Sequence, residues 1–143
     1  MATIFDKQGV VLDTTLIVLW FRCNHWLRTK ALAIRNDFLH GKIDILIPDL
    51  ALYELELALH QCSSYDANKI DLAIHSLQGM GLQIISTSAL CLVRAWEIAV
   101  NLFVSLPAAY FLAVAEHYGC QYWTADEEFY AKVSDWHIVR LIK

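Results

Sequence analysis

The chain has 143 residues and a mass of 16.3 kDa, which suits one sizeable hydrophobic core. Its apolar fraction of 57% is high, but charged residues and a proline interrupt the most apolar stretch, residues 90–115. We therefore expect no membrane-spanning helix, which needs ~20 predominantly apolar residues. The net charge of -4 at pH 7 argues against a chain that binds nucleic acid over its whole surface.

The composition also predicts a cytoplasmic protein. The N-terminus carries Asp6, Lys7 and Gln8 where a signal peptide would have an apolar segment. The cysteines occur singly, with no C-x-x-C pair or zinc-site spacing, at Cys23, Cys62, Cys91 and Cys120. We expect these thiols to be reduced.

Strand-like and helical patterns alternate along the chain. In chain order, the predicted elements are a strand at 9–13, a helix at 26–40, a strand at 43–47, helices at 49–60 and 67–80, a strand at 83–85, helices at 88–101 and 106–118, a strand at 121–124 and a last strand near 136–140. This alternation predicts one α/β domain over residues 1–143, with a mainly parallel central sheet of about five strands and helices on both faces.

A local excess of basic residues follows the first predicted strand. Between residues 22 and 42 only Asp37 is acidic, whereas five residues are basic, and four of these are candidates to contact an RNA backbone: Arg22, Arg28, Lys30 and Arg35. The alternative is a solvated helix face. Two tryptophans, Trp20 and Trp26, flank this stretch and are candidates either for stacking on RNA or for ordinary packing.

Three carboxylates occupy positions that favour a shared site. Asp13 closes the first strand, Asp126 follows the strand at 121–124, and Glu54 lies among apolar helical neighbours. In open α/β sheets ligands bind beyond the carboxyl ends of the strands, so Asp13 and Asp126 can reach one crevice. The alternative for each aspartate alone is that it caps the helix that follows it.

Three segments resemble the PIN-domain family, especially the small VapC-type ribonuclease toxins. They are Val11-Leu12-Asp13-Thr14, the stretch Ile47 to Leu55 that contains Glu54, and Thr124-Ala125-Asp126-Glu127-Glu128-Phe129. The resemblance implies that Asp13, Glu54 and Asp126 bind Mg²⁺ or Mn²⁺, with Thr124 as an accompanying hydroxyl. It also implies a homodimer and a small antitoxin protein as partner.

The chain departs from the family pattern at one acidic position. Pro107 stands directly before Ala108-Ala109-Tyr110, where the family normally has a further acid. Proline suits the first turn of a helix, so we expect the fold to tolerate it. Mg²⁺ usually takes one or two carboxylates together with waters and substrate phosphates, so three acids can still serve one ion.

Two hypotheses follow from this pattern. The first is a metal-dependent endoribonuclease of the toxin–antitoxin type, weakened by the missing acid. The second is a PIN-like fold that no longer cuts and acts through RNA or protein contacts. A phosphate-binding response domain is a weaker third reading, because no glycine-rich loop follows the first strand.

Overall fold

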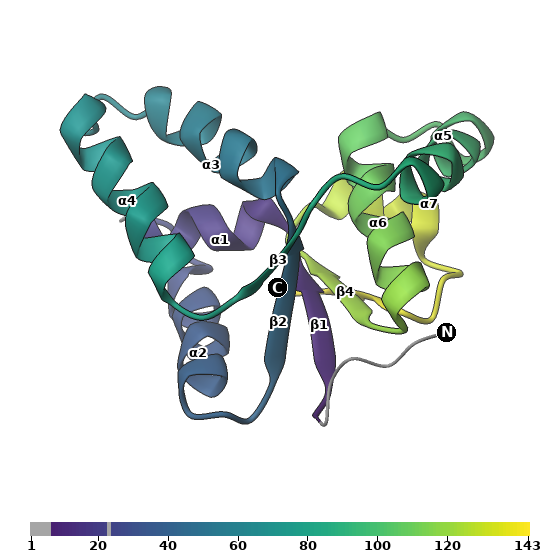
Figure 1. Cartoon of the computed structure of the whole chain (residues 1–143), viewed down its shortest axis with the longest axis horizontal. Coiled ribbons are helices and arrows are strands. Elements are labelled where there is room, and N and C mark those ends of the chain that lie inside the picture. Colours follow the sequence, from purple (N-terminus) through teal and green to yellow (C-terminus); the bar gives the residue numbers. More distant parts are fainter. Residues whose placement is uncertain (1–6, 23) are drawn as a thin grey trace.

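The computed structural model describes residues 7–22 and 24–143. Its centre is one parallel sheet in the order β3-β2-β1-β4-β5 (Figure 1). The strands are β1 (Gly9–Leu12), β2 (Asp44–Pro48), β3 (Gln83–Ile85), β4 (Gln121–Thr124) and β5 (Val139–Leu141). Every adjacent pair of strands is parallel, so the predicted α/β fold with a five-stranded parallel sheet is confirmed.

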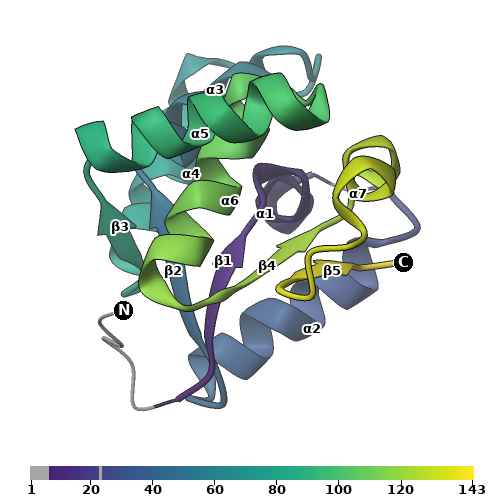
Figure 2. The same ribbon diagram turned by 90° about the vertical axis from the view of Figure 1, so that its right-hand side faces the viewer.

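Seven helices cover the sheet in the described part of the chain. They are α1 (Thr14–Phe21), α2 (Arg28–Leu39), α3 (Leu50–His60), α4 (Ala67–Gly79), α5 (Ala89–Leu102), α6 (Leu106–Tyr118) and α7 (Glu127–Val133). Figure 1 shows α1 to α4 on one side of the sheet and α5 to α7 on the other. Turned by 90°, Figure 2 shows α6 lying across the strands, and α6 contacts β1, β2 and β4.

The core is built from apolar strand residues that face helices on both sides. Val10, Val11 and Leu12 in β1 are completely buried, as expected for a central strand of a parallel sheet. Residues 109–115 of α6 are also buried, which explains why this helix has almost no polar face. No helix in the described part of the chain is long and apolar enough to cross a membrane.

The last predicted strand begins later than its sequence indicated. Residues 137 and 138 form a turn, which Val139 N closes by donating to Trp136 O. The strand itself starts at Val139. The other helix and strand predictions agree with the structure to within two residues at each end.

The predictions of a cytoplasmic location and of reduced thiols rest partly on Asp6 and Cys23, which lie outside the described residues. The other three cysteines, Cys62, Cys91 and Cys120, are free thiols.

Candidate functional site

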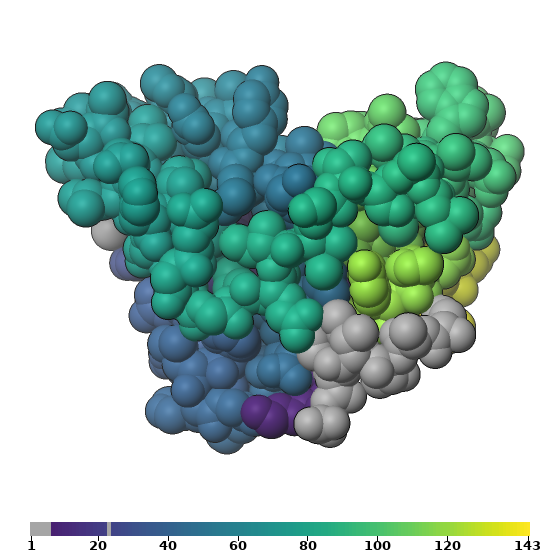
Figure 3. All heavy atoms as spheres, viewed as in Figure 1, coloured from purple at the N-terminus to yellow at the C-terminus, as the bar shows by residue number. Residues whose placement is uncertain are grey.

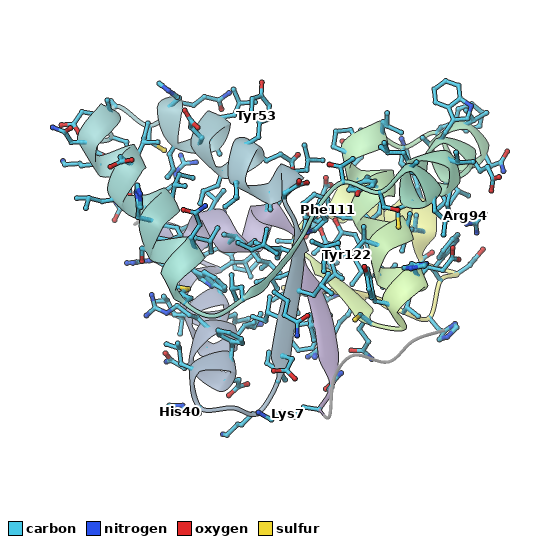
Figure 4. All side chains as sticks on the ribbon, viewed as in Figure 1. Lys7, His40, Tyr53, Arg94, Phe111 and Tyr122 are labelled. Carbon is cyan, nitrogen blue, oxygen red and sulfur yellow. The ribbon has the colours of Figure 1, made fainter. Side chains whose placement is uncertain are left out.

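The carboxyl edge of the sheet brings together the three predicted acids. Asp13 follows β1, Glu54 lies in the second turn of α3, and Asp126 precedes α7. All three line one cavity of about 170 Å³. Figure 3 shows the molecular surface hollowed between the α3–α4 side and the α5 side, and Figure 4 shows two cavity-lining residues, Phe111 and Tyr122, near the centre of the molecule below this hollow.

Asp13 is a buried carboxylate held by three hydroxyl groups. Tyr122 Oη donates to Asp13 Oδ1 at 2.8 Å, and the hydroxyls of Thr15 and Thr124 both donate to Oδ2 at 2.7 Å. Burial raises the pKa of Asp13, these three hydrogen bonds oppose that rise, and the negative charge of Asp126 adds to it. The two aspartates line the same cavity.

The two threonines connect Asp13 to the loop between β4 and α7. Ala125 N donates to Thr15 Oγ1 at 3.2 Å, and Asp126 N donates to Thr124 Oγ1 at 3.0 Å. A backbone N–H can only donate, so each threonine oxygen accepts from the loop and its own proton points to Asp13. These bonds set the position of Asp126 relative to Asp13.

Asp13 and Asp126 differ in the role that capping plays. Asp126 is the N-cap of α7, and its Oδ1 accepts from Phe129 N at 2.9 Å. Asp13 occupies the N-cap position of α1 but makes no capping hydrogen bond, because its oxygens accept from the hydroxyls. The capping alternative therefore accounts for one oxygen of Asp126 and for none of the side-chain contacts of Asp13.

Glu54 lines the cavity, but the apolar residues around it on α3 do not all face the core as the sequence had indicated. Leu57, one of the apolar residues around it, is 50% exposed, and the buried stripe of α3 consists of Ala51, Leu55 and Leu59. Glu54 is half-buried beside this stripe and accepts from Thr14 Oγ1 at 2.9 Å. Burial raises the pKa of Glu54, and the charge of Asp13 raises it further.

Tyr122 is a site residue that the sequence reading did not identify. The sequence pattern predicts it only as a strand residue, whereas in the structure it is completely buried and lines the cavity. Alternate residues of a strand face the same side, so Tyr122 and Thr124 point to the same face. A tyrosine two positions before Thr124 was the available signal.

Pro107 lies where the sequence argument put the missing acid. It is in the first turn of α6, whose N-cap Ser105 accepts from Ala108 N, and it lines the same cavity as the three carboxylates. Proline offers no side-chain oxygen, and the two α6 residues that line the cavity after it, Ala108 and Phe111, are also apolar.

The donor chemistry of the cavity fits a hard divalent cation. Its polar lining consists of carboxylate and hydroxyl oxygens, the ligand type that Mg²⁺ and Mn²⁺ prefer. Within residues 7–22 and 24–143, no group of three His, Cys, Asp or Glu side chains is close enough together to hold a metal ion as it stands. The three carboxylates line the cavity without forming a closed protein cage, so water or phosphate would have to complete the coordination of an ion there.

None of the four predicted RNA-contacting residues lines this cavity. Arg28 Nε donates to Leu19 O at 3.1 Å, and Lys30 Nζ donates to the Lys143 carbonyl oxygen. Arg22 borders a separate depression beside α4, and the Nε atom of Arg35 is buried without a hydrogen-bond partner among the described residues. Figure 1 shows α2, which carries three of these residues, below α1 and at the far end of the molecule from α3.

The two flanking tryptophans are in different environments. Trp20 is buried at 3% exposure and donates to Ala31 O, so it packs in the core and cannot stack on RNA. Trp26 is 71% exposed and stacks on His25.

Comparison with known proteins identifies the fold. The family model described as PIN domain matches residues 10–134. Among solved structures, a toxin–antitoxin complex from Klebsiella pneumoniae is 16% identical, with a TM-score of 0.71 and coverage of 94% of this chain and 98% of that chain. VapC20 of Mycobacterium tuberculosis, a sarcin-ricin loop cleaving toxin, is 17% identical, with a TM-score of 0.69 and coverage of 85% and 93%.

A third solved structure is VapBC2 from Rickettsia felis bound to a DNA fragment from its promoter. It is 15% identical, with a TM-score of 0.67 and coverage of 94% of this chain and 97% of that chain. At these identities the similarity concerns the fold. No curated protein was found to match this chain by sequence.

Proposed function

Because the chain belongs to the PIN-domain family, we propose that it is a metal-dependent endoribonuclease of the toxin–antitoxin type that hydrolyses RNA phosphodiesters. The observation that carries this proposal is the meeting of Asp13, Glu54 and Asp126 around one cavity at the carboxyl edge of the sheet. PIN domains generally bind Mg²⁺ or Mn²⁺. Asp13, Glu54 and Asp126 would hold the ion, which when bound supplies activation of a water nucleophile and stabilisation of the charge that develops on the phosphate.

The chain's own side chains have distinct tasks in this proposal. Asp13 is the fixed ligand, because its carboxylate is buried and hydrogen-bonded on both oxygens. Thr124 orients it while receiving the N–H of Asp126. Asp126 uses Oδ1 for capping and keeps Oδ2 for a ligand, and Glu54 contributes from α3, where Thr14 holds it.

The direct test is cleavage of a panel of structured RNAs with and without Mn²⁺ or Mg²⁺. The wild type is compared with Asp126→Asn, and with Asp135→Asn as a control that changes an exposed aspartate outside the cavity. We expect metal-dependent cleavage by the wild type and by the control, and loss of this cleavage in Asp126→Asn. Equal cleavage by wild type and Asp126→Asn would defeat the proposal, because a contaminating nuclease gives that pattern.

One observation favours a second candidate function. Pro107 lines the cavity at the position where the family normally has an acid, so the cavity has one carboxylate fewer. With less negative charge, the repulsion between two closely spaced metal ions is less well offset. The alternative is a PIN domain with little or no catalysis that acts through RNA or protein contacts. Divalent-ion titration separates the two candidates, because a binding module has no need for the ion.

We extend the proposal to RNA contacts by Arg22, Arg28, Lys30 and Arg35. Since they lie away from the cavity, they would bind the backbone of an RNA that continues past the cleaved bond. Replacing Lys30, which is exposed, with Gln should weaken RNA binding and lower its salt dependence while leaving Mn²⁺ binding unchanged.

We further propose two protein partners, a second copy of the chain and a small antitoxin. The helix α5 supports the first, because several of its apolar side chains are exposed, among them Val93 and Trp96 at 63% and Val100 at 52%. The second rests on the toxin–antitoxin complexes among the structurally similar proteins.

We also propose that residues 1–143 form one domain and that it acts in the cytoplasm.

A further inference from the structure

The Asp13 carboxylate lies in an environment without any described cationic partner. Its side-chain contacts are three hydroxyl groups, and its charged neighbours in the cavity, Glu54 and Asp126, are both acidic. A buried carboxylate normally needs a cation or several hydrogen bonds to offset its desolvation. Here the hydroxyls of Tyr122, Thr15 and Thr124, which we call the hydroxyl cage, meet that need.

The hydrogen-bond directions show which oxygen of Asp13 remains open. Thr15 and Thr124 each accept a backbone N–H, so both donate their own proton to Oδ2. A carboxylate oxygen has about two acceptor positions, so these donors saturate Oδ2. Tyr122 is the one donor to Oδ1 among the described residues, so Oδ1 is the oxygen that can still bind a cation.

Removal of the Tyr122 hydroxyl would leave Asp13 anchored. The two threonine bonds to Oδ2 hold the carboxylate, and the Tyr122 ring packs near Phe111 and Phe129 at centroid distances of 6.1 and 5.7 Å. The substitution Tyr122→Phe keeps this ring packing and takes away only the proton donated to Oδ1. Its principal effect is therefore on the charge that Oδ1 presents to the cavity.

We propose that Tyr122 is a positioning residue that partly neutralises Asp13 Oδ1 in place of the divalent cation, so that the domain stays folded without metal and the hydroxyl lowers the affinity of this oxygen for the ion. The proposal rests on the metal site of the proposed function, and it concerns only this chain's response to the ion. A hydrogen bond to Oδ1 withdraws negative charge from the oxygen that would ligate the ion. The hydrogen bond therefore stabilises the metal-free protein and lowers its affinity for the metal ion.

The test compares wild type, Tyr122→Phe and Tyr110→Phe in two experiments. Calorimetric titration measures the Mn²⁺ affinity of each protein, and thermal unfolding with and without Mn²⁺ measures its melting temperature. Tyr110 is the matched control, because it is also buried and its hydroxyl accepts from Ser88 N outside the cavity. We expect Tyr122→Phe to bind Mn²⁺ roughly 10- to 150-fold more tightly than wild type, which corresponds to losing one charge-assisted hydrogen bond. Its melting temperature should fall without Mn²⁺ and recover with it, whereas Tyr110→Phe should fall equally in both.

Weaker or unchanged Mn²⁺ binding by Tyr122→Phe, with wild type binding normally, overturns this inference and leaves the proposed function intact. If wild type binds no Mn²⁺, the metal-dependent function and this inference both fail. Thr15→Val provides a second test if Tyr122→Phe does not fold, because Thr15 is exposed and donates to the same carboxylate. Because Thr15 holds Oδ2 and leaves the Tyr122 hydrogen bond on Oδ1, this variant should bind Mn²⁺ no more tightly than wild type, and tighter binding would contradict the role given to Tyr122.

Discussion

Thr14 Oγ1 donates a 2.9 Å hydrogen bond to Glu54 Oε1 and so joins the first turn of α1 to the second turn of α3. Thr14 directly follows Asp13, so this bond sets where Glu54 lies relative to the buried aspartate. Glu54 has more rotatable bonds than Asp13 and only this one described hydrogen bond. Its orientation therefore depends on Thr14 more than that of Asp13 depends on any single hydroxyl.

Replacing Thr14 with Val should weaken Mn²⁺ binding about 10- to 100-fold, the usual cost of losing a group that orients a metal ligand. Valine has nearly the same shape, so the buried packing at this position is kept. Calorimetric Mn²⁺ titration measures the effect, with circular dichroism to confirm folding. Unchanged affinity would show that Glu54 does not depend on Thr14.

Replacing Glu54 with Gln should reduce RNA cleavage by at least about 100-fold, because a charged ligand is lost from the site. Glu56→Gln is the matched control: it lies on the same helix, is exposed, and pairs only weakly with His60 at 4.0 Å. Single-turnover cleavage rates at saturating Mn²⁺ provide the measurement. Equal rates for both variants would remove Glu54 from the site.

The metal-free protein should lose stability as the pH rises. Burial raises the pKa of Asp13 and that of Glu54 above their ordinary values of 3.8 and 4.5. The folded state then binds these protons more tightly than the unfolded state, so the free energy of unfolding falls from the ordinary pKa values up through the raised ones.

Urea unfolding in EDTA, from about pH 5 to about pH 8, measures this trend. The double variant Asp13→Asn, Glu54→Gln should have a smaller pH dependence than wild type. Mn²⁺ should offset the fall in wild type, because the ion binds the ionised carboxylates. A pH dependence that is the same in both proteins would assign the trend to other groups.

Pro107→Asp should tighten Mn²⁺ binding by about 10-fold or more, because it returns a carboxylate to the wall of the cavity. Leu106→Asp is the control, since it adds the same charge in the same turn of α6 at a residue that does not line the cavity. Both variants place an acid at a helix N-terminus, so the helix dipole affects them alike. Similar affinities in the two variants would point to general electrostatics and not to a restored ligand.

Trp96→Glu should shift the protein from dimer to monomer, because it puts a charge into the exposed apolar face of α5. Trp26→Glu changes a tryptophan that is exposed to a similar extent but lies outside this helix, and it should leave the association unchanged. Sedimentation velocity over a range of protein concentrations measures both. A wild type that stays monomeric throughout would rule out dimerisation by α5 in that range.

The sequence by itself determined the five strands, five of the seven described helices and the positions of the three acids, whereas the short helices α1 and α7 were not among the predicted elements. These features are local: apolar runs form buried strands, the helical period marks amphipathic segments, and the strand ends place Asp13 and Asp126 at the carboxyl edge. The substitution at Pro107 was visible for the same reason, since its neighbours along the chain identify the position.

Only the tertiary structure decided which side chains meet. Tyr122 is 109 positions from Asp13 in sequence, and only the parallel pairing of β1 with β4 brings the tyrosine hydroxyl to the carboxylate. The same packing buries Trp20 and carries α2 with its basic residues away from the cavity. Hydrogen bonds and burial of this kind depend on distance in space, which periodicity and spacing along one chain do not contain.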